Sequence, residues 1–268
     1  MNQLRSTQPS PRAPAPKVPS DRPDLRPLLL FAAVALGVGG LLLTMSTLIA
    51  PGAPFILAAV LGGLALPALV LTHRDAGAGG VRALLRDCVR MPSSWWWLPT
   101  ASFGLPVLAW TTAAGLGGAQ PLTWSLLGYF VGDLLVGAIV INIWEEMAWT
   151  GFVQRRAMVR WGATGGSLLT AVFFTGIHVP LAFDGAHSAG QVASNILLIA
   201  GVATGVRLLI GRVDAWTGRS LLTVGILHSS FNATETILMP AYDWVRIVMT
   251  IAVAVVLVAF TRRDRPVV

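Results

Sequence analysis

The sequence predicts an all-α protein, a polytopic membrane helix bundle of about eight transmembrane helices, and three observations support this fold class. Only 12% of the 268 residues are charged and 54% are hydrophobic, whereas charged residues make up about 25% of a typical soluble domain. Several successive apolar runs reach the roughly 20 residues that a helix needs to cross a bilayer. With one exception, Lys and Arg fall in the tails or in alternate connections between these runs. The chain is therefore expected to cross a membrane many times within one domain.

The basic residues indicate how the chain is oriented in the membrane. Of the 19 Lys and Arg residues, 18 fall in the tails or in connections on one side, and only Arg246 falls on the other. Cytoplasmic loops are rich in Lys and Arg, so both termini are predicted to be cytoplasmic. The net charge of +7 then reflects topology, and no nucleic-acid partner is expected. The basic residues assigned to cytoplasmic connections are Arg74, Arg82, Arg86 and Arg90, then Arg155, Arg156 and Arg160, then Arg207, Arg212 and Arg219.

Residues 1–26 are rich in Pro, Ser and charge and lack an apolar period, which is typical of a disordered tail. Residues 27–262 are expected to form the transmembrane domain, and residues 263–268 a second cytoplasmic tail. Residues 81–91 alternate Arg with Leu and Val, which favours a short helix on the cytoplasmic membrane surface. The predicted spans are residues 27–49, 54–71, 96–114, 122–152, 164–183, 191–210, 220–239 and 245–260.

Two adjacent carboxylates, Glu145 and Glu146, interrupt the apolar run of residues 122–152. A charged side chain at the centre of a membrane helix costs roughly 2.5–3.5 kcal/mol on insertion scales, so partners are expected. His178 and His228 lie in later apolar runs, and Asn232 follows His228 on the same helix face. At 1.5 Å per residue, Glu145, both histidines and Asn232 lie about 12–21 Å from the cytoplasmic ends of their spans. These five residues are predicted to form one buried polar site that performs chemistry.

Two kinds of chemistry fit this set of residues. In the first, a glutamate activates water with the help of a histidine, and a second histidine and an amide stabilise an oxyanion. In the second, Glu145, His178 and His228 bind a divalent metal, such as zinc, that activates water. The His-Glu-x-x-His signature of zinc proteases is absent from the sequence, but two histidines and one carboxylate would still supply three ligands. Spacing alone leaves both chemistries open.

At these residues the sequence resembles a known family. The matching positions are Glu145-Glu146 with Trp149 and Gly151, then Phe174-x-x-x-His178, then His228-x-x-x-Asn232. They look like the three motifs of the CPBP intramembrane proteases, which include the CAAX prenyl protease (Rce1-like) enzymes and the Abi proteins. The usual motifs are Glu-Glu-x-x-x-Arg, Phe-x-x-x-His and His-x-x-x-Asn or Asp. The resemblance implies a protease domain with its motif core at about residues 122–239.

The resemblance implies a role for each motif residue. Glu145 with His178 would activate the attacking water, His228 and Asn232 would stabilise the oxyanion, and Glu146 would support the site by hydrogen bonding. This mechanism depends on glutamate and needs no cofactor, although such proteins have often been labelled metalloproteases.

The first motif departs from the family pattern at its last position. Thr150 stands where the motif arginine is usual, and Arg155 and Arg156 follow about one and a half turns later. If that arginine normally pairs with a motif carboxylate, the pairing is either lost or rebuilt in this chain.

The leading hypothesis is an intramembrane endopeptidase that cleaves a membrane-associated peptide near the cytoplasmic leaflet, with a prenylated CAAX tail as the family's best-known substrate class. One alternative is a non-proteolytic membrane protein that binds a peptide or confers immunity to a bacteriocin. A transporter is disfavoured because no two apolar segments look like matched broken helices. The expected partners are the lipid bilayer and a peptide substrate. The excess of Arg over Lys favours a GC-rich bacterial gene, and hence a multi-pass protein of the bacterial inner (plasma) membrane.

Overall fold

The computed structural model describes residues 25–49 and 53–261, and helices dominate throughout these ranges. The all-α prediction is confirmed. Apart from residues 25 and 26, the predicted tails lie outside the described residues. The α-helices are α1 (Arg26–Val34), α2 (Gly40–Thr44), α3 (Ala53–Ala58), α4 (Leu66–Cys88), α5 (Trp97–Gly115), α6 (Trp124–Val136), α7 (Ile143–Glu146), α8 (Arg155–His178), α9 (Ala189–Trp216), α10 (Leu221–Ala233) and α11 (Trp244–Thr261).

Shorter π-helical and 3-10 segments join or extend these helices. The π-helical segments are η1 (Ala35–Gly39), η2 (Met45–Ile49), η3 (Ala59–Ala65), η4 (Gly137–Asn142) and η5 (Met147–Gln154), and the 3-10 segments are η6 (Val179–Phe183), η7 (Thr234–Ile237) and η8 (Pro240–Tyr242).

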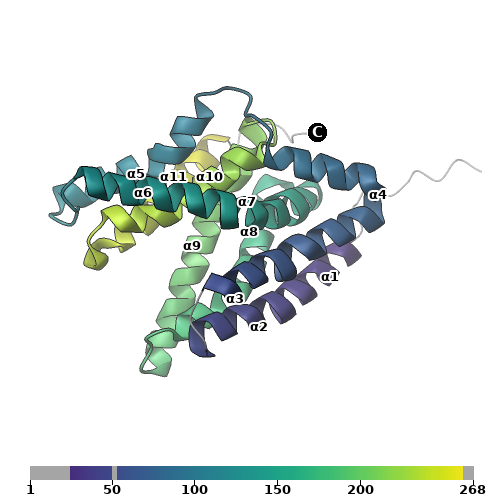
Figure 1. The fold of residues 1–268 in the computed structure, drawn as a ribbon, viewed down its shortest axis with the longest axis horizontal. Coiled ribbons are helices and arrows are strands. Elements are labelled where there is room, and N and C mark those ends of the chain that lie inside the picture. The colour runs from purple at the N-terminus through teal and green to yellow at the C-terminus, as the bar shows by residue number, and fades with distance from the viewer. Residues whose placement is uncertain (1–24, 50–52, 262–268) are drawn as a thin grey trace, which may run out of the picture.

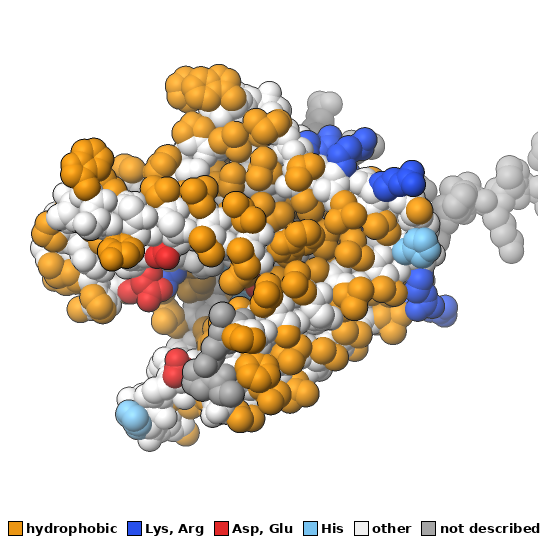
Figure 2. Space-filling model, in the orientation of Figure 1, with side chains coloured by type: hydrophobic (Ala, Val, Ile, Leu, Met, Phe, Trp, Pro, Cys, Tyr) orange, Lys and Arg blue, Asp and Glu red, His pale blue; other side chains and the backbone are white. Residues whose placement is uncertain are grey.

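The protein is a multi-pass membrane protein. Within the described ranges, five helical stretches are long and apolar enough to cross a bilayer: Arg26–Ile49, Pro54–Cys88, Trp124–Phe183, Ala189–Trp216 and Pro240–Phe260. Hydrophobic side chains cover most of the face shown in Figure 2, and Lys and Arg side chains gather at the edge formed by α4. The predicted count of eight crossings and the cytoplasmic location of the termini stay predictions.

Two glycines turn the chain where the sequence suggested loops. Gly162 has φ 71° inside α8, and Gly77 has φ 63° inside α4. This backbone region is open to glycine at little steric expense, so each helix breaks and resumes without a loop. Residues 155–160, which the sequence analysis placed in a connection between two spans, are helical up to the break at Gly162. The predicted surface helix at residues 81–91 corresponds to the end of α4, after Gly77.

Two helix groups flank the segment that carries the paired glutamates. Figure 1 shows α1 to α4 on one side of α7 and α8, and α5, α6, α10 and α11 on the other. On the first side, Phe31 of α1 packs against Trp149, with ring centroids 5.3 Å apart. On the second side, apolar residues of α5, α9, α10 and α11 form a separate core that includes Val206 and Leu227. The paired glutamates therefore lie between two apolar cores.

Within the first group, two helical segments approach closely at glycines. Gly39 of η1 faces Gly63 of η3, and a Cβ built on Gly63 would lie 2.6 Å from the Gly39 Cα. Small residues let membrane helices approach each other in this way. The contact fixes the helical pair that supports Trp149 and its neighbours.

The paired glutamates occupy the single α-helical turn α7, between the π-helical segments η4 and η5. π-helical turns are rare and are frequently found at functional sites. All eight residues of η5 are buried, so protein surrounds this segment on every side. A charged group placed here can only be matched by other protein groups.

Candidate active site

Glu146 lies at the centre of the candidate site, and its side chain is fully buried. Arg207 donates hydrogen bonds to both carboxylate oxygens, at 3.0 Å to Oε2 and in a shorter ion pair to Oε1. The Thr150 hydroxyl also donates to Oε2, and His228 Nδ1 lies 2.7 Å from Oε1. Hydrogen bonds of this charge-assisted, two-pronged kind fix orientation strongly. Glu146 is therefore held in place and has little capacity left for a substrate or water.

Glu145 lies in a different environment, although it is the next residue. Its only hydrogen bond among the described residues comes from Asn142 Nδ2, which donates to Oε2 at 3.2 Å. The same oxygen lies 3.8 Å from His228 Nδ1. A carboxylate can accept about four hydrogen bonds, so Glu145 retains free acceptor sites. The two adjacent glutamates thus differ in what they can still bind.

His228 and His178 each have one ring nitrogen committed to a protein partner. His228 is buried, with Nδ1 on Glu146. His178 is partly exposed, with Nδ1 2.7 Å from the Phe174 carbonyl oxygen. A carbonyl only accepts, so His178 Nδ1 must carry the hydrogen, which leaves Nε2 as an acceptor. Each ring therefore has Nε2 as its remaining polar atom.

Phe174 contributes more than core packing. Its ring lies 4.3 Å from the His178 ring and 5.9 Å from the His228 ring, between centroids. Its carbonyl fixes His178, as described above. The Phe-x-x-x-His spacing thus brings both the Phe174 ring and the Phe174 carbonyl into contact with His178. Among the described residues His178 forms no direct hydrogen bond or ion pair with Glu145.

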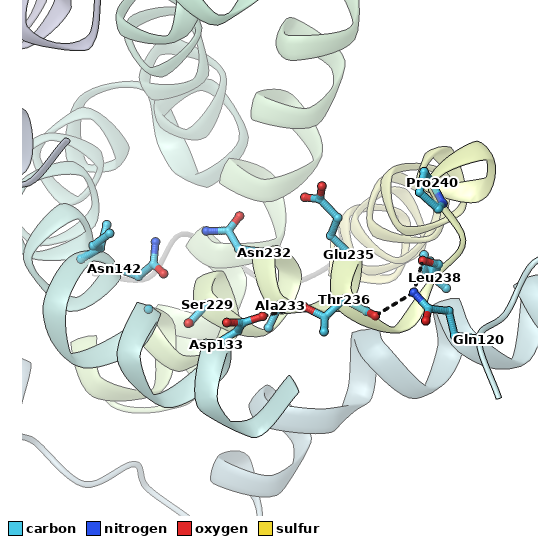
Figure 3. A pocket seen from close by; sticks show the side chains of 12 residues that line it. Gln120, Asp133, Asn142, Ser229, Asn232, Ala233, Glu235, Thr236, Leu238 and Pro240 are labelled. Atoms are coloured by element: carbon cyan, nitrogen blue, oxygen red, sulfur yellow. Dashed lines mark hydrogen bonds between the residues drawn. The ribbon is translucent and has the colours of Figure 1, made fainter. Parts of the chain in front are cut away.

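Asn232 is the one predicted residue that stands apart from this cluster. Its side chain is exposed, and its amide makes no hydrogen bond to the described members of the cluster. It lines a cavity of about 570 Å³ instead. Figure 3 shows Asn142 and Asn232 at one end of this cavity and Gln120 and Pro240 at the other. Because Asn142 also holds Glu145, the cavity reaches the cluster through Asn142.

Arg207 is the site residue that the sequence analysis missed. Its assignment to a cytoplasmic connection was wrong, because it lies within α9 and is fully buried. Its guanidinium also stacks over the Phe174 ring, 4.5 Å from the centroid. A signal was present in the sequence, since an arginine in an apolar run needs a partner, and the motif arginine was missing at Thr150. In this chain an arginine from another helix, α9, pairs with the motif carboxylate Glu146.

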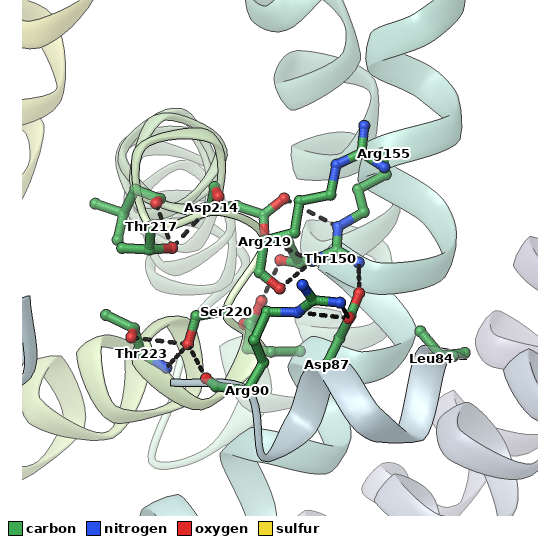
Figure 4. A network of polar contacts seen from close by, with 12 residues as sticks. Leu84, Asp87, Arg90, Thr150, Arg155, Asp214, Thr217, Arg219, Ser220 and Thr223 are labelled. Atoms are coloured by element: carbon green, nitrogen blue, oxygen red, sulfur yellow. Dashed lines mark hydrogen bonds and ion pairs between the residues drawn. The ribbon is translucent and has the colours of Figure 1, made fainter. Parts of the chain in front are cut away.

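Arg155, one of the two arginines that follow Thr150, pairs elsewhere. It donates to both oxygens of Asp214, at 3.0 and 2.8 Å, to Asp87 at 2.7 Å and to the Arg219 carbonyl at 2.9 Å. Figure 4 shows this network, in which Arg90 also binds Asp87. The network ties together the ends of α4, α8 and α9 and the start of α10. It clamps the helices that carry the site without contacting Glu146.

The described residues contain no group of three or more His, Cys, Asp or Glu side chains placed to hold a metal ion. Glu145, His178 and His228, the three ligands considered from the sequence, are thus not arranged as a ready ligand set. Zinc dependence is a question for a chelation experiment, described below.

Residues 123–234 match the family model described as type II CAAX prenyl endopeptidase Rce1-like. This region is Rce1-like. It contains all five predicted site residues together with Thr150 and Arg207, so the recognition made from the three motifs is confirmed. No curated protein sequence matches the chain. The Rce1-like family is a protease family, so this similarity supports a peptidase activity in general and a membrane-associated peptide as the general kind of substrate.

Proposed function

We propose that the protein is an intramembrane endopeptidase in which Glu145, assisted by His178, activates a water molecule to hydrolyse a peptide bond. The observation that carries this proposal is the contrast between the two adjacent glutamates. Glu146 is saturated by Arg207, Thr150 and His228, whereas Glu145 accepts a single hydrogen bond. A general base needs a free acceptor within reach of water. Glu145 meets that requirement, and Glu146 serves as a support.

In the proposed reaction, Glu145 takes a proton from water as the water oxygen attacks the peptide carbonyl carbon. The carbonyl oxygen becomes a tetrahedral oxyanion, which the Asn232 amide and His228, through Nε2, would stabilise. The C–N bond then breaks, and the proton held by Glu145 passes to the leaving amine. His178 Nε2 would hold the water between itself and Glu145. The hydrogen bond between His228 Nδ1 and Glu146 supports this use of the opposite ring nitrogen.

The cavity beside Asn142 and Asn232 supplies room for a peptide. Its volume of about 570 Å³ is within the range of ordinary ligand pockets. The family description favours a prenylated CAAX-type tail as substrate, cleaved near the cytoplasmic leaflet. We propose this substrate class for the chain.

Purified protein in liposomes tests the proposal with a quenched fluorescent peptide that ends in a farnesylated Cys-Val-Ile-Met sequence, alongside the unprenylated peptide. Glu145→Gln and His178→Ala should each lower kcat by about 100-fold or more, in line with the loss of acid–base catalysis. Asp184→Asn, which removes an exposed carboxylate from a connection, is the matched control and should match the unmodified protein. Full turnover by folded Glu145→Gln would refute the role of Glu145. Cleavage of the unprenylated peptide at the same rate would refute the prenylated substrate class.

Two further measurements separate the alternatives. Loss of activity with a chelator, restored by zinc, would replace the metal-independent mechanism with the metal-dependent one. Protection of cells from a bacteriocin that survives Glu145→Gln, with no peptide cleaved by the unmodified protein, would favour an immunity protein that binds its target without cutting it.

A further inference from the structure

We infer that Arg207 is a positioning residue that replaces the missing arginine of the first motif and orients both site histidines, a role that rests on the proposed function. Thr150 occupies the motif position, one turn after Glu146. Its hydroxyl donates to Glu146 and lies 3.4 Å from Arg207 Nη1. A threonine and an arginine from different helices therefore converge on the carboxylate that a single motif arginine could reach.

Positions 150 and 207 share one small volume. Thr150 is 1% exposed and Arg207 is 0% exposed, so no solvent-filled space remains around them. Residues four apart lie on the same helix face, and a long side chain at position 150 would extend over Glu146. That space is filled by the Arg207 guanidinium. The site accommodates one guanidinium, delivered either from position 150 or from position 207.

Arg207 acts on His228 through Glu146. Both of its terminal nitrogens bind the Glu146 carboxylate, and this fork fixes the plane of the carboxylate. The fixed Oε1 then accepts from His228 Nδ1 at 2.7 Å, which sets the direction of the ring. Arg207 Nε has no hydrogen-bond partner among the described residues, and Glu146 is the one carboxylate that the guanidinium binds there.

Arg207 acts on His178 through Phe174. Its guanidinium stacks over the Phe174 ring of the Phe-x-x-x-His motif, with 4.5 Å between Arg207 Cζ and the ring centroid. The same ring lies 4.3 Å from the His178 ring. A cation over an aromatic face restrains that ring, and a restrained ring limits the rotation of the imidazole packed on it. One buried guanidinium thus restrains both site histidines.

Four variants test the inference: Arg207→Leu, Thr150→Arg, the double variant Thr150→Arg/Arg207→Leu, and the control Arg212→Leu on the same helix. Arg207→Leu should lower kcat by about 100-fold with little change in KM, because misplaced catalytic groups reduce rate in this way. Thr150→Arg alone should also lower kcat, since two guanidiniums would compete for one carboxylate. The double variant should recover most of the activity, and Arg212→Leu should retain it.

Specific outcomes would overturn the inference. Folded Arg207→Leu with unchanged kcat would do so, as would a double variant that is no more active than Arg207→Leu. Recovery of the melting temperature without recovery of kcat would reduce Arg207 to a structural role. If Arg207→Leu does not fold, a double variant that folds and cleaves supports the exchange, and one that stays unfolded refutes it.

If the proposed peptidase function is wrong, these variants give a different set of results. If the unmodified protein cleaves neither peptide, the melting temperatures of the same variants still decide whether positions 150 and 207 exchange one guanidinium. Strong non-additivity between the two substitutions supports the exchange, and additive effects refute it.

Discussion

His228 Nδ1 lies 2.7 Å from Glu146 Oε1 and 3.8 Å from Glu145 Oε2, so one imidazole nitrogen is within 4 Å of both adjacent glutamates. The short contact ties the ring to the saturated carboxylate, and the longer one leaves the second carboxylate free. Two residues of the same type, joined by one peptide bond, thereby take different parts in a single site. The variants below separate these parts.

Glu146→Leu should lower the free energy of unfolding by about 3–5 kcal/mol, because it leaves the Arg207 charge buried without its partner. The double variant Glu146→Leu/Arg207→Leu should recover most of that stability, since replacing both members of a buried pair with apolar residues is often neutral. Unfolding in detergent measures both. The double variant should nevertheless remain inactive. A double variant as unstable as Glu146→Leu would contradict the interpretation of these two residues as a matched pair.

Phe174→Leu should lower kcat by about 10-fold and the free energy of unfolding by about 1–3 kcal/mol, since it removes the ring packed between Arg207 and His178. Phe173→Leu, one residue earlier and partly buried against the same core, is the matched control. It should affect stability but leave kcat unchanged. Peptide cleavage and thermal melting of both variants provide the comparison. Equal losses of kcat would show that Phe174 acts through general packing alone.

Arg155→Met should lower the free energy of unfolding by about 1–3 kcal/mol while the folded fraction keeps its kcat. The loss follows from two carboxylates, Asp87 and Asp214, which are largely buried and would lose their shared cation. Arg156→Met is the control, because its contact with Asp75 is longer, 3.4 Å, and more exposed, and such surface pairs contribute about 0–1 kcal/mol. Chemical unfolding of the two variants should rank Arg155→Met as the less stable. The reverse order would argue against the clamp.

Gly63→Ala should lower the free energy of unfolding by about 1–3 kcal/mol, because its new Cβ would meet the Gly39 Cα at 2.6 Å and push two helices apart. Gly62→Ala is the control, since a Cβ at Gly62 meets nothing within 4 Å. That substitution should be neutral or stabilising by about 0.5–1 kcal/mol, as expected for alanine in place of glycine within a helix. Similar melting temperatures for the two variants would contradict the close approach at Gly63.

The sequence predicted those features of the site that depend on the chemistry of the side chains alone. Charged and imidazole groups in apolar runs are expensive, so Glu145, Glu146 and His228 were expected to meet, and His228 Nδ1 lies within 4 Å of both carboxylates. The partner at Arg207 was overlooked because it is 61 residues from Glu146 along the chain and because basic residues near span ends resemble loop residues. The break at Gly162 was also missed, since a single glycine conformation replaces a loop without altering composition.

The position of Arg207 also bears on how the chain is inserted during synthesis. A guanidinium inside a membrane helix costs roughly 2.5–3.5 kcal/mol when it enters lipid alone, and α9 carries that of Arg207, which is fully buried. Glu146 is synthesised earlier than Arg207, so the anion is already present when the cation arrives. We therefore expect α9 to leave the translocon paired with the segment that carries Glu146. Insertion of this protein would then couple these two segments, and they would not enter the membrane independently.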